Sequence, residues 1–134
     1  MVLVESSRST MLAYLDALVT RGNFAQYFTP DIVVSLVGES QEAQGAEAAE
    51  QFIRAVHEQA FDATPEVKTL TVEESKAAIE ADFVGRHTGE FLGRAATGNE
   101  VRVPYSVHYD LENGRIKALR IYGILPGLIK QIEP

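Results

Sequence analysis

AAIEADFVGRHTGEFLG at residues 77–93, NEVRVPYSVHYDL at 99–111 and RIKALRIYGIL at 115–125 are three extended segments that follow one another along the chain. Each alternates with the period of two that is typical of a strand with two different faces. The link between the second and third contains Asn113-Gly114, a strong hairpin signal because both residues tolerate a positive φ. Together the segments predict a long, curved antiparallel meander built around a small-molecule pocket.

The residues before this meander predict three helices and two more strands. An amphipathic helix is expected over residues 9–23, with Ser9 or Thr10 as its N-cap and Gly22 as its C-terminal stop. The other expected elements, in chain order, are a short helix around residues 24–28, a buried strand over 31–38, a polar loop over 39–45, a helix over 46–61 and a strand over 66–74. This order predicts an α+β fold in which N-terminal helices cover the concave face of a mostly antiparallel, cone-shaped sheet.

Composition narrows the classes of function. A chain of 134 residues with 46% hydrophobic residues predicts a single domain spanning residues 1–134. The absence of cysteine excludes disulfides and thiolate chemistry, and three scattered histidines argue against a metal or other cofactor. A net charge of -7 argues against nucleic acid as a partner. Neither a membrane span of roughly 20 apolar residues nor a signal peptide is recognisable, so we expect no membrane partner and a cytoplasmic protein.

Strand parity predicts which side chains share the pocket. We take one face of each long strand as the inward face, because in two of the three strands that face is clearly the more apolar. In the last strand the inward face is that of Ile116, Ala118, Arg120 and Tyr122. The candidate ligand-binding residues, which include aromatic side chains from the helices and the first long strand, are Tyr14, Phe28, Phe83, Tyr105, Tyr109 and Tyr122.

Two inward polar residues are the candidate catalytic groups. His87 can act as an acid or a base near neutral pH, although a histidine at a strand end can also be a structural hydrogen-bonding residue. Arg120 can hold an acidic or enolate-like ligand, or it can form a structural salt bridge. His57 and His108 are expected at the surface.

Leu119 and Ile121 fall on the outer face under the same parity. Two adjacent exposed apolar side chains on a strand favour a covering partner, so a homodimer through the outer sheet face is expected.

The stretches HTGEFLGRAATGNEV (87–101) and PYSVHYDLENGRI (104–116) resemble the SnoaL-like polyketide cyclase branch of the nuclear transport factor 2-like superfamily. The resemblance extends over most of the chain, up to the closing LIKQI (128–132). It implies a cone-shaped, dimeric domain that closes a ring in a polyketide by intramolecular aldol condensation without metal or cofactor. In that chemistry a carboxylate removes a proton next to a carbonyl, and neighbouring donors stabilise the enolate.

The sequence departs from the family pattern at the expected acid. The family usually carries it on the last strand, where this chain has Ile121 and Ile124. One hypothesis is a cofactor-independent cyclase, lyase or isomerase acting on a small, mostly apolar carbonyl compound, with His87 as acid or base and with Arg120 and Tyr105 as oxyanion donors. A second is a non-catalytic protein that binds such a compound. An epoxide hydrolase-like function is a third, but its Asp-Arg-Asp relay has only Arg120 as a plausible member.

Overall fold

The structure is a computed structural model that describes residues 3–133. Its elements in chain order are α1 (Leu3–Val19), η1 (Phe24–Tyr27), β1 (Phe28–Leu36), β2 (Glu42–Gln44), α2 (Ala46–Arg54), η2 (Ala55–Ala60), β3 (Phe61–Val72), β4 (Lys76–His87), β5 (Glu100–Glu112), β6 (Arg115–Tyr122) and α3 (Ile124–Gln131). No helix within residues 3–133 has both the length and the apolar character needed to cross a membrane.

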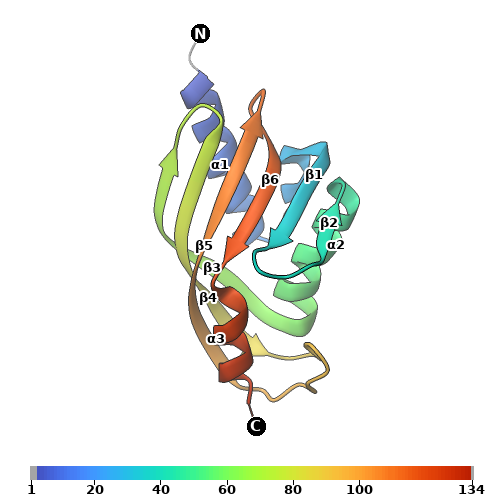
Figure 1. Cartoon of the computed structure of the whole chain (residues 1–134). Helices are drawn as coiled ribbons and strands as arrows, with labels where there is room; N and C mark the ends of the chain where they lie inside the picture. Colours follow the sequence, from blue (N-terminus) through green and yellow to red (C-terminus); the bar gives the residue numbers. More distant parts are fainter. Residues whose placement is uncertain (1–2, 134) are drawn as a thin grey trace.

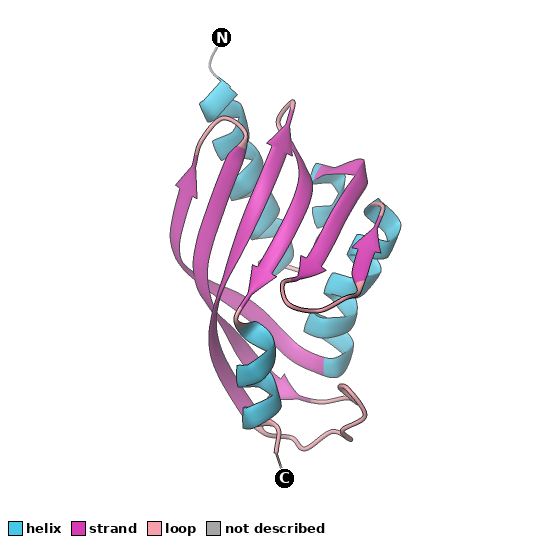
Figure 2. Ribbon diagram, in the orientation of Figure 1, coloured by secondary structure: helices cyan, strands magenta, loops and turns pink. Residues whose placement is uncertain are grey.

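The described strands form one curved sheet in the order β2-β1-β6-β5-β4-β3. Neighbouring strands are antiparallel except β1 and β6, which run parallel. Figure 1 shows α1 and α2 behind the sheet and α3 at its lower end, and Figure 2 shows the long strands β3 to β5 bending around the helices. The predicted α+β fold, with helices covering one face of a mostly antiparallel sheet, is confirmed.

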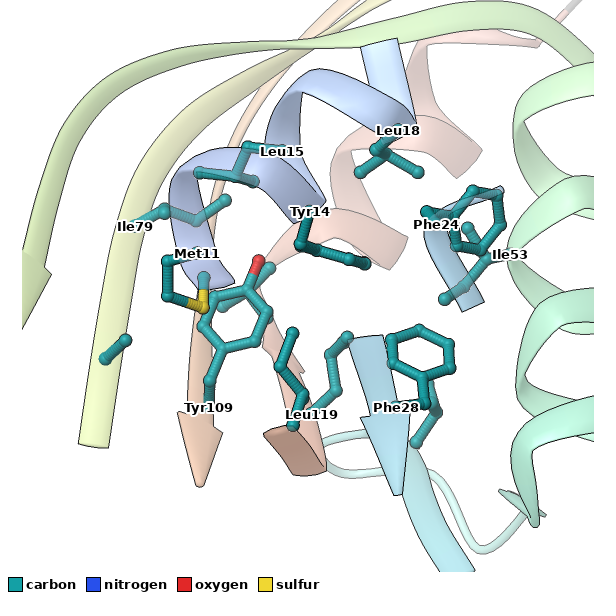
Figure 3. Packing of buried hydrophobic residues seen from close by; sticks show 14 of the residues in the cluster. Met11, Tyr14, Leu15, Leu18, Phe24, Phe28, Ile53, Ile79, Tyr109 and Leu119 are labelled. Carbon is teal, nitrogen blue, oxygen red and sulfur yellow. The ribbon is translucent and has the colours of Figure 1, made fainter. Parts of the chain in front are cut away.

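The main core lies between α1 and the upper part of the sheet (Figure 3). Tyr14 is buried there, with its ring centroid 5.6 Å from that of Phe28 and 6.0 Å from that of Tyr109. A second apolar cluster, which includes Phe61, fills the space between β3, β4, β5 and α3. Tyr105 and Ile121 pack against both clusters, so the boundary between the two cores runs through them.

Helix α1 begins earlier than predicted. It starts at Leu3, so Ser9 and Thr10 lie inside the helix and neither is its N-cap. The Thr10 hydroxyl donates instead to the carbonyl oxygen of Gly114 at 2.5 Å, and the Ser7 hydroxyl donates to that of Glu74 at 2.6 Å. These hydroxyls therefore bind the helix to two strand connections, a long-range role that local capping rules do not anticipate.

Other predicted boundaries were also wrong. Strand β1 starts at Phe28 and not at residue 31, and β3 starts at Phe61 and not at residue 66. The predicted polar loop contains the short strand β2, which pairs with β1. The predicted continuous helix over residues 46–61 changes at Ala55 into the π-helical turn η2. The first long strand stops at His87, and residues 88–99 form a loop. Apart from the isolated bridge between Phe91 and Arg94, the residues of this loop pair with no strand.

A β-bulge at Lys117 reverses the predicted faces of the last strand. Leu111 pairs with Ile116 and Asp110 pairs with Ala118, so one residue of β5 opposes two residues of β6. An extra residue shifts the alternation by one position and turns every later side chain to the opposite face. The parity prediction holds for β4 and β5, where Ile79, Phe83, Val103 and Val107 are buried, and it was wrong for β6 beyond the bulge.

This reversal removes Leu119 and Ile121 from the outer sheet face, where they were expected to favour a dimer. Leu119 is 3% exposed and lies in the core of Figure 3, and Ile121 packs against both apolar clusters. Dimerisation itself stays a prediction, which light scattering can test.

Candidate functional site

A cavity of about 470 Å³ lies between the helices, the sheet and α3. Its size falls within the range of small-molecule sites. Most of its wall is apolar, and the lining residues with polar side chains are Glu39, Ser40, Gln41, Glu42, His57 and Tyr105. The first four belong to the exposed segment after β1, so the polar groups deeper in the cavity are His57 and Tyr105.

His57 lies on the cavity wall, where its prediction as a surface residue was wrong. Its Nδ1 is 2.8 Å from the carbonyl oxygen of Ile53. A carbonyl only accepts, so Nδ1 carries the proton and Nε2 keeps its lone pair. Nε2 is buried and has no hydrogen-bond partner among the described residues.

His57 lies in the π-helical turn η2. Phe52, Ile53, Val56 and His57 line the cavity together, so His57 shares the inward face of this helical segment and does not lie beside it. Burial lowers the pKa of His57 below 6.5, assisted by the nearby Arg21, while Ile53 and Glu58 act in the opposite direction. The imidazole is therefore neutral at pH 7 and can accept a proton.

Phe83 lies between His57 and Tyr105. Its ring centroid is 5.2 Å from that of His57 and 6.4 Å from that of Tyr105, both in edge-to-face geometry. Burial, with a smaller effect of Asp82, raises the pKa of the Tyr105 hydroxyl. This phenol stays protonated at neutral pH and can donate a hydrogen bond. Phe83 and Tyr105, both predicted as ligand-binding residues, line the cavity.

The other predicted ligand-binding residues lie elsewhere. Tyr14, Phe28 and Tyr109 pack in the main core and are not among the cavity-lining residues. Tyr122 follows the bulge in β6, is 39% exposed on the outer face and packs against His108. An inward position on a strand is thus not sufficient for a residue to line the cavity, because α1 fills part of the concave face.

His87 is fully buried, as its parity predicted, but it does not line the cavity. Its Nδ1 accepts the backbone N–H of Thr97 at 3.1 Å and lies 3.0 Å from the Thr97 hydroxyl. Its ring lies 5.1 Å from that of Phe61. These contacts fix the loop over residues 88–99 onto the end of β4, which is the structural role that the sequence left open.

Arg120 lies on the outer face, away from the cavity. It donates two hydrogen bonds to the Asp110 carboxylate, from Nη1 at 2.9 Å and from Nη2 at 3.0 Å. Lys76 Nζ adds a contact of 2.6 Å to the same carboxylate. The structural salt bridge, one of the two alternatives considered for Arg120, is the one that the structure shows.

Replacing Asp110 with asparagine is expected to lower the free energy of unfolding by about 2 kcal/mol at neutral pH. Arg120 and Lys76 hold the pKa of this carboxyl at about 2, below its usual 3.8. The stabilisation is complete above pH 3.8 and is lost as the pH falls from 3.8 towards 2. Urea unfolding measures the free energy of unfolding of both proteins. Wild type should be more stable than Asp110→Asn at neutral pH, and this difference should disappear as the pH approaches 2. Asp31→Asn, at an exposed position of β1, is the control that should change little.

Among the described residues, no acid lies on the inner wall of the cavity, where the family pattern places one. Ile121 and Ile124 line the cavity, and the carboxylates among the lining residues of the described chain are the exposed Glu39 and Glu42. No group of three or more His, Cys, Asp or Glu side chains within residues 3–133 could hold a metal ion.

Comparison with known proteins identifies the family. A model of the SnoaL-like polyketide cyclase family matches residues 10–132. This chain belongs to the SnoaL-like polyketide cyclase family. The match covers nearly the whole chain and confirms the resemblance seen in the sequence. A search among curated proteins finds no match.

Solved structures with several different names share the fold at low sequence identity. A protein from Jannaschia sp. CCS1, named as a candidate SnoaL-like polyketide cyclase, is 21% identical with a TM-score of 0.86, covering 98% of this chain and 96% of its own. AclR from Streptomyces galilaeus, named as a candidate hydroxylase, is 21% identical with a TM-score of 0.78 and covers 95% of both chains. A candidate ketosteroid isomerase from Kribbella flavida is 18% identical with a TM-score of 0.70, covering 89% of this chain and 78% of its own.

Proposed function

We propose that this SnoaL-like protein is a cofactor-independent cyclase or isomerase that transfers a proton on a small, mostly apolar carbonyl compound. The observation that carries the proposal is the buried, unpartnered Nε2 of His57 on the wall of an apolar cavity. A buried polar atom without a partner among the described residues is costly, and a ligand proton would provide one.

The chemistry follows from the two deep polar groups. Nε2 of His57 takes a proton from the carbon next to the ligand carbonyl, and the electrons of that C–H bond move onto the carbonyl oxygen as an enolate. The Tyr105 hydroxyl donates to that oxygen. Returning the proton to another carbon of the same conjugated system isomerises the compound. Attack of the enolate carbon on a second carbonyl forms a C–C bond, and His57 protonates the new alkoxide, which closes a ring.

The named relatives support this class of reaction. Cyclisation of a polyketide and isomerisation of a ketosteroid both begin with removal of a proton next to a carbonyl, and the chains so named share this fold. In this chain the imidazole of His57 replaces the carboxylate as the base. A neutral imidazole whose pKa lies below 6.5 has a basicity closer to that of a carboxylate than an exposed histidine has.

The test is α-proton exchange on β-tetralone, a small apolar ketone with acidic protons next to its carbonyl. Proton NMR in D₂O should show that the wild-type protein accelerates deuterium incorporation at that carbon above the rate in buffer. Exchange no faster than in a solution of the same protein after thermal unfolding would contradict the proposal.

A non-catalytic binding function is the second candidate, favoured by Ile121 and Ile124 on the wall where the family usually carries its acid. It predicts that β-tetralone binds, seen as changes in the NMR spectrum of the protein, while its α-protons exchange at the rate in buffer. The same sample distinguishes the two functions.

A further inference from the structure

The loop that follows β4 carries a two-residue turn at the cavity. Phe91 and Arg94 exchange two backbone hydrogen bonds, of 2.9 and 3.0 Å. Between them Leu92 has φ +50° and Gly93 has φ +79°. Two successive residues with positive φ inside a doubly hydrogen-bonded pair are the geometry of a type I′ turn.

The hairpin between β5 and β6 provides a comparison within the same chain. Its central residues, Asn113 and Gly114, have φ +51° and +73°, nearly the same as Leu92 and Gly93. Asparagine adopts the left-handed region readily, whereas the branched side chain of leucine is disfavoured there. The chain therefore uses the favoured residue at one turn and a disfavoured one at the turn beside the cavity.

The side chain of Leu92 is also poorly placed for a purely structural role. It is 56% exposed, yet it is one of the residues that line the cavity. The neighbouring Phe91 already anchors the turn, with its ring 5.2 Å from that of Phe61. Leu92 thus combines an unfavourable backbone conformation with an apolar side chain that the protein itself leaves half in water.

We propose that Leu92 is a specificity-determining residue that covers an apolar ligand at the mouth of the cavity. The ligand buries the exposed part of the leucine side chain, and this contact offsets the cost of the left-handed conformation. The proposal rests on the proposed function in one respect, namely that the cavity takes an apolar compound, and it is independent of proton transfer by His57.

The experiment compares Leu92→Asn with wild type in fluorescence titrations with prodan, an uncharged, apolar fluorescent ketone. The variant reproduces the residue pair of the Asn113-Gly114 turn, so its Tm should be equal to or higher than that of wild type. Its Kd for prodan should rise about tenfold, because most of one leucine side chain is no longer buried by the ligand. Leu12→Gln, at a 51% exposed leucine of α1, is the control that should leave the Kd unchanged.

Three results would overturn the inference. The first is a Kd of Leu92→Asn for prodan within about twofold of the wild-type value. The second is a lower Tm of Leu92→Asn together with its weaker binding, which would mark Leu92 as a structural residue. The third is failure of the wild-type protein to bind prodan. The exchange test with β-tetralone separates this inference from the proposed function. If proton transfer is wrong and Leu92 does cover the ligand, wild type does not accelerate the exchange but still binds prodan, and Leu92→Asn binds prodan more weakly than wild type.

Discussion

Replacing His57 with asparagine is expected to lower the rate of α-proton exchange on β-tetralone by about 100-fold or more, the usual size of a general acid–base contribution. The amide of asparagine can still donate to the Ile53 carbonyl, which His57 Nδ1 contacts at 2.8 Å, so the packing of η2 should survive. What the variant lacks is the lone pair of Nε2. Proton NMR in D₂O measures the exchange rate, and circular dichroism checks that the fold is retained.

The pH dependence of exchange adds a second, independent readout. His57 must be neutral to take a proton, and burial lowers its pKa below 6.5. The decline of the exchange rate with falling pH should therefore be centred below pH 6.5. Arg21 near the end of α1 lowers this pKa further, and Glu58 within η2 raises it. A decline centred above pH 6.5 would be inconsistent with a buried imidazole as the base.

The matched control is another histidine of the same chain. His108 lies on the outer face of the sheet beside Tyr122, at a ring distance of 5.2 Å, and does not line the cavity. His108→Asn should leave the exchange rate unchanged. Equal losses in both histidine variants, or no loss in His57→Asn, would remove His57 from the mechanism.

Replacing Gly85 with alanine is expected to lower the free energy of unfolding by about 3 kcal/mol and the Tm by about 10 °C. Gly85 pairs with Ala63 across β3 and β4. A methyl group at Gly85 would come within 2.5 Å of Ala63 Cα and closer still to the carbonyl oxygen of Asp62. Both are backbone atoms of a neighbouring strand, so relief requires the strands to separate.

Thermal unfolding monitored by circular dichroism measures this effect, and Gly22→Ala is its control. At Gly22 the nearest atom to an added methyl group is the Thr20 hydroxyl at 3.5 Å, an ordinary contact distance, so this variant should change the Tm little. A Gly85→Ala protein that unfolds at the same temperature as the Gly22→Ala protein would show that β3 and β4 can separate at low cost.

Much of the candidate site was not predictable from residue patterns. Phe83 and Tyr105 were predicted to line the pocket because β4 and β5 alternate without interruption up to these positions, and both do line it. Arg120 was placed inward because strict alternation was assumed along the whole last strand. The residues around Lys117 contain no sequence signal for the bulge that breaks this alternation. His57 was placed at the surface because it lies beside the apolar stripe of its helix, and only the packing of the helix on the sheet decides which neighbour of a stripe meets a cavity.

The sequence by itself determined the family, the order of the elements and the α+β class. These depend on periodicity, turn residues and sequence motifs, each of which is contained in a few neighbouring residues. Tertiary structure alone decided which polar groups meet in the cavity. A one-residue bulge turned Arg120 outward to Asp110. His57 and Tyr105 meet at the cavity wall because the ring of Phe83 from β4 lies close to both of them. A bulge is a local irregularity that only the pairing of distant strands can select, because its cost is compensated by contacts far away in sequence.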